Sequence, residues 1–299
     1  MHIVLVDPSG VVRKTISGML VSAGHTVMAF SDSAAALAQV AADPSVTCVL
    51  TSLEVQPLDG LELCWSLRAL ADDRRPLTIL VMSSARERRP LDEVLDAGAD
   101  DFLMKPPEAQ ELRGRLRSAE RVLKLQQALI RQADTDHLTQ LLNRGAFMRQ
   151  AQAAVESAAV SRPLAVMQLD IDHFKKINDR HGHDVGDLVI RHIAQILRET
   201  GAIAGRLGGE EYALLLLDHS LGAAAVVAHR VRSQCAGSAL LERSCPLRFT
   251  VSIGLSEWSE GDSVGTLLKR ADVSLYAAKE GGRNRVAMTS STLKIEFVS

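Results

Sequence analysis

The sequence has few of the features that mark secreted, membrane-spanning or strongly charged proteins. It has only four cysteines in 299 residues, and their spacing is not that of a metal site, so we expect reduced thiols in a cytoplasmic protein. No apolar run approaches the roughly 20 residues of a membrane-spanning helix, and the N-terminus begins with a strand pattern, not a signal peptide. The 34 basic residues nearly balance the 36 acidic ones. This balance indicates no polyanion-binding surface, and we expect neither nucleic-acid nor membrane partners.

Short apolar strands alternate with helical patterns over residues 1–108. This alternation is typical of an α/β domain with a doubly wound parallel sheet, whose ligands bind beyond the carboxyl ends of the strands. Polar residues follow several of the expected strands, namely Asp7, Ser84 and Lys105. Together with the stretch 98–102, they make this domain similar to a response-regulator receiver.

The resemblance fails at two positions that carry the phosphate chemistry of receivers. It implies a second acid after the first strand, where this chain has Pro8, and a phosphate-accepting aspartate seven residues before the Asp-Gly pair of the third loop, where it has Ser52. Proline cannot bind magnesium and serine carries no carboxylate. Lys105 is then either a phosphate sensor or, as we expect, a sheet-end lysine without its partner. We predict a pseudo-receiver with no phosphorylation site, which serves dimerisation or binds another protein.

Residues 109–133 have the pattern of a linker helix. Apolar or small residues recur alternately four and three positions apart, which is typical of a coiled-coil seam. The seam consists of Leu112, Leu116, Ala119, Leu123, Gln126, Ile130 and Ala133. We expect this helix to join two copies of the chain; the alternative is a helix packed against its own receiver-like domain.

Acidic residues lie at a strand end and at a turn in the C-terminal part. Residues 164–169 have the pattern of a buried strand that ends at Asp170, and 208–212 are Gly-Gly-Glu-Glu-Tyr, a predicted β-hairpin turn. Glu210 and Glu211 must point in different directions, because successive side chains of a strand alternate. Magnesium prefers oxygen ligands and retains phosphates as further ligands. We therefore predict a metal site shared by Asp170 and Glu210; the alternative for the turn alone is a solvated hairpin tip.

Four blocks in the C-terminal part resemble the signature motifs of the GGDEF diguanylate cyclase family and follow the family's order. They are residues 136–144, 170–187, 208–212 and 276–285, and four independent blocks make a specific match. The resemblance implies an α+β, nucleotide-cyclase-like domain over 134–290, followed by a tail over 291–299. It also implies an enzyme that joins two GTP molecules into cyclic di-GMP, releases two pyrophosphates, works as a homodimer and uses Mg²⁺ or Mn²⁺.

The resemblance also assigns roles to single residues in these motifs. The metal ligands it implies are Asp170, Glu210, Glu211 and the carbonyl oxygen of Ile171. Glu210 is also the implied proton acceptor, and Lys175 matches the lysine that stabilises the developing phosphate charge. These two residues are therefore the predicted catalytic residues.

The remaining motif positions are predicted to bind substrate. Asn178 and Asp187 suit guanine, because an amide and a carboxylate can pair with its polar edge and mispairing costs about 1–3 kcal/mol. His183 either contacts substrate or satisfies the loop backbone, and Asp172 is expected to order the loop. A forked guanidinium and an ammonium suit terminal phosphates, and glycines let the backbone approach them. These phosphate-binding positions are Lys279, Arg283, Gly208 and Gly209.

Two departures from the family pattern affect the expectations for this domain. Tyr212 stands where the family has phenylalanine, and its hydroxyl needs a partner. The Arg-x-x-Asp motif of the family's product-inhibition site aligns with Glu199 and Ala202, so we expect weak or absent feedback inhibition. The alternatives to an active cyclase are a silent adaptor that binds GTP or cyclic di-GMP and a protein-interaction scaffold.

Overall fold

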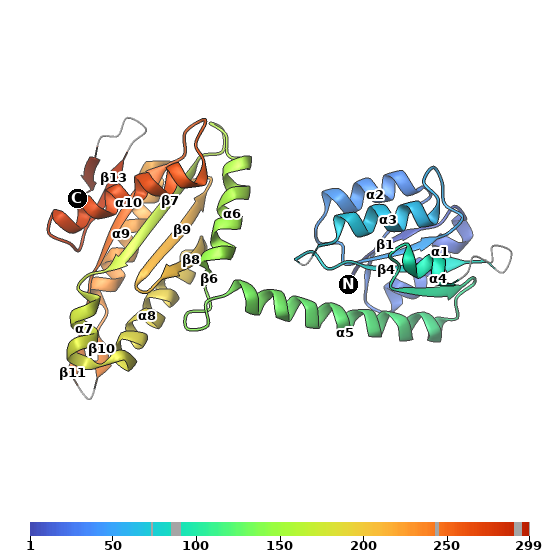
Figure 1. The fold of residues 1–299 in the computed structure, drawn as a ribbon, viewed down its shortest axis with the longest axis horizontal. Helices are drawn as coiled ribbons and strands as arrows, with labels where there is room; N and C mark the ends of the chain where they lie inside the picture. Colours follow the sequence, from blue (N-terminus) through green and yellow to red (C-terminus); the bar gives the residue numbers. More distant parts are fainter. Residues whose placement is uncertain (73, 85–90, 243–244, 290–294, 299) are drawn as a thin grey trace. The chain divides into compact units, whose positions relative to one another are not determined.

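The computed structural model describes residues 1–72, 74–84, 91–242, 245–289 and 295–298 (Figure 1). The chain divides into two compact units, Met1–Ala133 and Asp134–Ser299. Each unit has its own sheet and its own buried cores. Because the two units fold around separate cores, each is described by itself.

The first unit contains a five-stranded parallel sheet with the order β2-β1-β3-β4-β5. Its strands are β1 (His2–Val6), β2 (Thr26–Phe30), β3 (Cys48–Ser52), β4 (Thr78–Ser83) and β5 (Asp101–Met104). Its helices are α1 (Gly10–Ser22), α2 (Ser33–Ala42), α3 (Gly60–Leu70), α4 (Leu91–Asp96) and α5 (Ala109–Asp134). One face of the sheet packs against α1 and α5, and the other packs against α2 and α3. This arrangement confirms the predicted doubly wound fold.

The N-terminal half of α5 packs against its own sheet, which corrects the predicted coiled-coil seam. Leu112 and Leu116 are 1% and 2% exposed and belong to the core formed with β1, β3, β4 and β5. Leu123 is also buried. The exposed apolar side chains of α5 lie on a different stripe, Val122, Leu125 and Leu129. A spacing of three and four marks a buried stripe of a helix, but it does not reveal whether a sheet or a second helix covers that stripe.

Truncating the two kinds of leucine in α5 should have very different effects on folding. Leu116→Ala removes a side chain from the receiver-like core and should lower the free energy of unfolding by about 2–5 kcal/mol. Leu125→Ala, at a position 61% exposed, should change it by at most about 0.5 kcal/mol in the isolated chain. Urea denaturation at low protein concentration measures both. Equal losses in the two variants would contradict this packing of α5.

The second unit contains a seven-stranded mixed sheet with the order β14-β13-β12-β7-β9-β8-β6. Its strands are β6 (Leu142–Asn143), β7 (Leu164–Ile171), β8 (Ile203–Gly208), β9 (Glu211–Leu217), β12 (Val251–Glu257), β13 (Val286–Thr289) and β14 (Ile295–Val298). Its helices are α6 (Arg144–Ser157), α7 (Phe174–His181), α8 (His183–Arg198), α9 (Leu221–Gly237) and α10 (Val264–Glu280). A small hairpin of β10 (Leu240–Glu242) and β11 (Cys245–Leu247) is separate from this sheet.

The two faces of this sheet have separate cores. Helices α8 and α9 cover one face, and α6 and α10 cover the other. The central strand β7 pairs antiparallel with both β9 and β12. This mixed sheet with helices on both faces confirms the predicted α+β fold and places the end of β7 beside the β8–β9 hairpin.

The structure adds elements that the sequence did not predict. The expected tail over 291–299 includes β14, which pairs antiparallel with β13 at the edge of the sheet, so these residues extend the domain; residues 291–294 and 299 lie outside the described residues. Helix α7 occupies a stretch expected to be loop.

Three cysteines, Cys48, Cys64 and Cys235, are free and buried. Burial raises the pKa of each of these thiols to about 12, which keeps them protonated and poorly reactive. The side chain of the fourth, Cys245, lies outside the description. In the part of the chain that the structure describes, every helix is too short or too polar to cross a bilayer.

Candidate active site

The end of β7 and the β8–β9 turn bring three acidic residues together. Asp170 pairs directly with Glu211, the first residue of β9. Directly opposed residues of an antiparallel pair point to the same face, so these two carboxylates are neighbours, and Glu210 precedes them in the turn. Burial raises the pKa of Asp170, Lys279 opposes this rise through a hydrogen bond and its charge, and Glu210 and Glu211 add to it. The three predicted metal-ligating side chains are therefore close enough to interact electrostatically.

Lys279 of α10 supplies the positive charge at this cluster. Its Nζ lies 2.9 Å from Oδ2 of Asp170, which is only 7% exposed. The sequence predicted that Lys279 binds terminal phosphates, and in the structure it pairs with a predicted metal ligand, Asp170. Lys279 therefore offsets the charge of the buried carboxylate by direct contact.

This donor set suits a hard divalent cation. Among the described residues, no three acidic, histidine or cysteine side chains form a complete metal site. Magnesium commonly binds through one or two protein carboxylates and completes its shell with water and substrate phosphates. Asp170 and the hairpin acids therefore fit a metal that is held jointly by protein and nucleotide.

An arginine that the sequence analysis did not single out holds the hairpin turn. Nε and Nη2 of Arg206 donate to the carbonyl oxygen of Gly209 at 2.9 and 2.6 Å, and Nη1 donates to Oδ1 of Asp136 at 3.1 Å. Burial disfavours the charged form of Asp136, but hydrogen bonds from Thr139 and Arg206 outweigh it and lower the pKa of this carboxyl. The 136–144 block therefore anchors the turn that carries Glu210.

The two glycines of the turn leave its outer side open. Gly209 has a φ of +48°, which favours glycine. A Cβ built at Gly208 or Gly209 would meet no atom within 4 Å. A ligand can therefore approach the backbone of the turn closely, as predicted for these positions.

Asn178 of α7 lies against the first turn of α8, the helix that carries Asp187. A Cβ on Gly186 would lie 2.0 Å from Oδ1 of Asn178, so the Asn178 amide packs directly against the glycine that precedes Asp187. Oδ1 of Asn178 is buried and has no hydrogen-bond partner among the described residues. An unpaired buried acceptor is costly, so this part of the site is not optimised for stability alone. Lys175 and His183 are both exposed.

Two polar residues near this site have structural partners. Asp172 accepts hydrogen bonds from Thr250 Oγ1 at 2.6 Å, Ser252 Oγ at 2.7 Å and the backbone N–H of Asn284 at 3.0 Å, so it joins the end of β7 to the start of β12 and to the segment after α10. The Tyr212 hydroxyl donates to the carbonyl oxygen of Ile190 at 3.1 Å. This partner satisfies the additional hydroxyl that distinguishes Tyr212 from phenylalanine.

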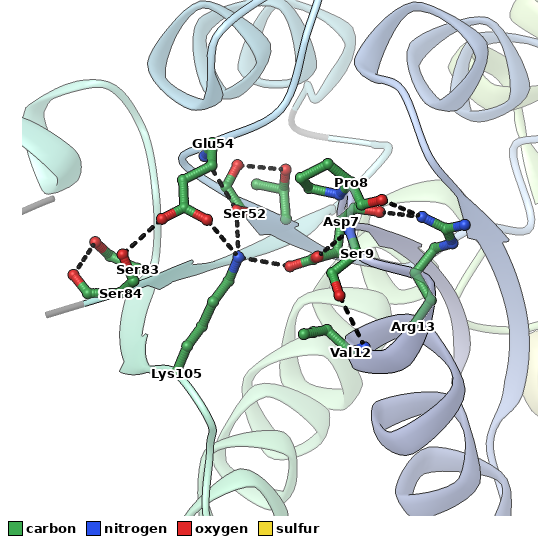
Figure 2. Close-up of polar contacts among 11 residues, drawn as sticks. Asp7, Pro8, Ser9, Val12, Arg13, Ser52, Glu54, Ser83, Ser84 and Lys105 are labelled. Atoms are coloured by element: carbon green, nitrogen blue, oxygen red, sulfur yellow. Dashed lines mark hydrogen bonds and ion pairs between the residues drawn. The ribbon is translucent and has the colours of Figure 1, made fainter. Parts of the chain in front are cut away.

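The carboxyl ends of the receiver-like sheet also form a polar cluster (Figure 2). Lys105 Nζ lies 2.6 Å from Asp7 Oδ2, 2.5 Å from Ser52 Oγ and 3.4 Å from Glu54 Oε2. Ser84 Oγ donates to the other oxygen of Glu54 at 2.5 Å. The hydrogen bond from Ser84 and the charge of Lys105 lower the pKa of Glu54, whereas burial raises it. The net result is a lowered pKa. Lys105 is therefore not the unpartnered sheet-end lysine that we expected, because Glu54, which no motif indicated, supplies a second carboxylate.

Comparison with known proteins agrees with both units. The family described as diguanylate cyclase, GGDEF domain, matches residues 133–285, and the response regulator receiver domain matches residues 3–117. The chain belongs to the GGDEF diguanylate cyclase family and carries a receiver domain in front of the GGDEF domain.

Individual relatives share parts of this organisation. The response regulator PleD of Caulobacter vibrioides is 34% identical over 263 residues, which cover 83% of this chain and 58% of PleD. Diguanylate cyclase A of Treponema denticola is 32% identical over 173 residues, 55% of this chain and 47% of the relative. The chain therefore spans roughly half of the length of these curated relatives.

Solved structures resemble this chain over its C-terminal part. The coiled coil and GGDEF domain of DgcB from Caulobacter crescentus, in complex with c-di-GMP, matches with a TM-score of 0.55 and 34% identity over 59% of this chain and 96% of that one. The diguanylate cyclase SiaD of Pseudomonas aeruginosa, in complex with its activator SiaC, matches with a TM-score of 0.53 and 32% identity over 59% and 69%.

Proposed function

We propose that this protein is a diguanylate cyclase that condenses two GTP molecules into cyclic di-GMP and releases two pyrophosphates. The observation that carries the proposal is the pairing of Asp170 with Glu211 beside Glu210, with Lys279 as the counter-charge. Family membership and relatives named as diguanylate cyclases support the same activity.

The proposed metal is Mg²⁺ or Mn²⁺, held by Asp170, Glu210, Glu211 and the carbonyl oxygen of Ile171. When bound, it would offset charge on the reacting phosphate and make the attacking ribose hydroxyl more acidic. Glu210 accepts the proton of that hydroxyl, which attacks the α-phosphorus as pyrophosphate leaves. Lys175 stabilises the charge that develops on the phosphate oxygens.

The other proposed roles concern substrate binding. Asn178 and Asp187 select guanine, as the resemblance to the family implies. Lys279 and Arg283 bind the terminal phosphates, and the backbone at Gly208 and Gly209 approaches them through the open side of the turn. His183 is exposed at the start of α8 and contacts the substrate from there.

Incubating the full-length protein with GTP and Mg²⁺ tests this function directly. We expect cyclic di-GMP and pyrophosphate in a ratio of one to two, as followed by chromatography. Because each GTP must meet a second one, we propose that two copies of the chain combine their sites, and specific activity should fall on dilution. Tight GTP binding without product would instead indicate a nucleotide-binding adaptor.

We further propose that the receiver-like domain acts without phosphorylation and binds a protein partner. Ser52 stands at the end of β3, and Asp7 and Glu54 already neutralise Lys105. Treatment with acetyl phosphate and Mg²⁺ should therefore leave the intact mass and the cyclase rate unchanged. A stable phosphoaspartate in residues 1–108, found by mass spectrometry, would contradict this prediction.

The proposed enzyme should also lack strong product inhibition at the family's inhibition site. Glu199 caps the C-terminal end of α8, and Ala202 lies three residues further on, so these positions offer neither the arginine nor the aspartate that the family uses there. Added cyclic di-GMP should inhibit only competitively with GTP, as shown by initial rates at several GTP concentrations. Tight non-competitive inhibition that is lost in Glu199→Ala would contradict this expectation.

A further inference from the structure

A second pocket of the C-terminal unit lies beside α7 and has a volume of about 430 Å³. Residues of α7, the end of α9, the segment 247–250 before β12 and Asn284 line it. This volume lies within the range of about 300–1,000 Å³ that is usual for small-molecule sites. The pocket is therefore large enough for a nucleotide-sized ligand.

The charges around this pocket are mostly positive. Among the described residues, its basic lining residues are His173, Lys176, Arg180, His181 and Arg248, and its acidic lining residue is Asp172. Both carboxylate oxygens of Asp172 already accept hydrogen bonds within the fold. Within the described ranges, Lys176, Arg180 and Arg248 form no ion pair, and all three are exposed. The pocket therefore offers positive charge that the described fold does not neutralise by direct contact.

The pocket and the proposed substrate site use different faces of α7. His173, Lys176, Ile177 and Arg180 follow one another at intervals of three, one and three, so they lie on one face of the helix. Lys175 and Asn178, three positions apart, lie on another, and neither lines the pocket. A ligand bound here would therefore not occupy the place proposed for guanine.

The apolar part of the lining indicates what accompanies the anionic group. Ile177, Ala236, Leu247 and Phe249 form it, and such a surface suits a ring more than a bare phosphate ion. Asp172 is the only carboxylate among the described lining residues. It already accepts three hydrogen bonds within the fold, which leaves it little capacity to accept the N–H groups of guanine. The pocket should therefore not distinguish guanine from adenine.

We propose that this pocket is a second nucleotide-binding site, which takes a nucleoside phosphate without selecting its base. Lys176, Arg180 and Arg248 bind the phosphate oxygens, and Ala236 and Leu247, the partly exposed apolar residues of the lining, contact the base. This proposal does not depend on the cyclase activity, because binding can be measured without turnover.

Calorimetric titration of the full-length protein with ADP in EDTA tests this site. Adenine avoids the guanine-selective positions, and EDTA removes metal-dependent phosphate binding. We expect Arg248→Glu to raise the Kd for ADP by about tenfold or more, because it replaces a phosphate-binding charge with a repulsive one. Lys176→Glu should have a similar effect, and it provides a second test if Arg248→Glu does not fold.

Lys269→Glu is the matched control, because Lys269 is an exposed lysine of α10 that does not line the pocket. It should change the Kd for ADP by less than about twofold, as expected of a remote surface charge. The proposal would be wrong if the unaltered protein gave no heat of ADP binding, or if Arg248→Glu and Lys176→Glu bound ADP as tightly as the unaltered protein. It would also be wrong if Lys269→Glu weakened binding as much as they do.

Discussion

Asp170→Asn should lower the rate of cyclic di-GMP synthesis by about 10²–10³-fold, the cost usual for removing one group that stabilises charge in a transition state. The amide keeps the size of the side chain but loses the charge that binds the metal and faces Lys279 at 2.9 Å. Burial disfavours the charged form of Asp170 and so raises its pKa. A neutral amide does not carry this cost of burying a charge, so folding should not suffer. Initial rates at saturating GTP and Mg²⁺ measure the loss, and thermal unfolding checks the fold.

Asp218→Asn is the control for this variant. Asp218 lies in the same unit, and its side chain is 61% exposed. Among the described residues, its only ion-pair partner is Arg162, at 3.3 Å. Removing such a surface pair costs at most about 1 kcal/mol, so activity should remain near that of the unaltered protein. An Asp170→Asn variant that keeps a tenth or more of the activity would remove the basis of the proposed metal site.

Gly186→Ala should raise the KM for GTP by about tenfold or more, since a mispaired buried polar group costs about 1–3 kcal/mol and 1.4 kcal/mol corresponds to a factor of ten. The added methyl group would lie 2.0 Å from Oδ1 of Asn178 and 3.1 Å from Phe174 Cζ. The amide of Asn178 must therefore leave its place against Gly186. Steady-state kinetics with GTP over a wide concentration range measures the change.

Gly222→Ala is the matched substitution. Gly222 lies in the first turn of α9, and a Cβ there meets no atom within 4 Å. Alanine is the better helix former, so this variant should be as stable as the unaltered protein or slightly more stable, with unchanged KM. If Gly186→Ala also left KM unchanged, Asn178 would not contribute to guanine binding.

The fold could be predicted from the sequence where a local pattern determines which distant segments of the chain come together. Alternating strands and helices predicted the parallel receiver-like sheet, because such connections place successive strands side by side. The buried run before Asp170 and the turn at Gly208 and Gly209 predicted that two separate segments meet. The pairing of Asp170 with Glu211 shows that they do.

Other features could not be predicted because one sequence pattern is compatible with several packing partners. The leucines of α5 have the spacing of a coiled coil, and the structure uses Leu112 and Leu116 to cover the sheet instead. Helix α7 is only eight residues long and is rich in charged residues, so its periodicity is short, and Phe174 and Ile177 are its only large apolar contacts. Glu54 and Arg206 belong to no expected motif, and only their contacts reveal what they do.

If the site binds a nucleotide and a cation as we propose, the ion pair between Lys279 and Asp170 should make the binding of each depend on the other. A cation that approaches alone must compete with an ammonium group already seated on its principal ligand. A triphosphate offers that ammonium a new partner, so its arrival frees the carboxylate at the moment when the cation is needed. The two ligands should therefore enter synergistically, and the protein should hold neither firmly while the other is scarce.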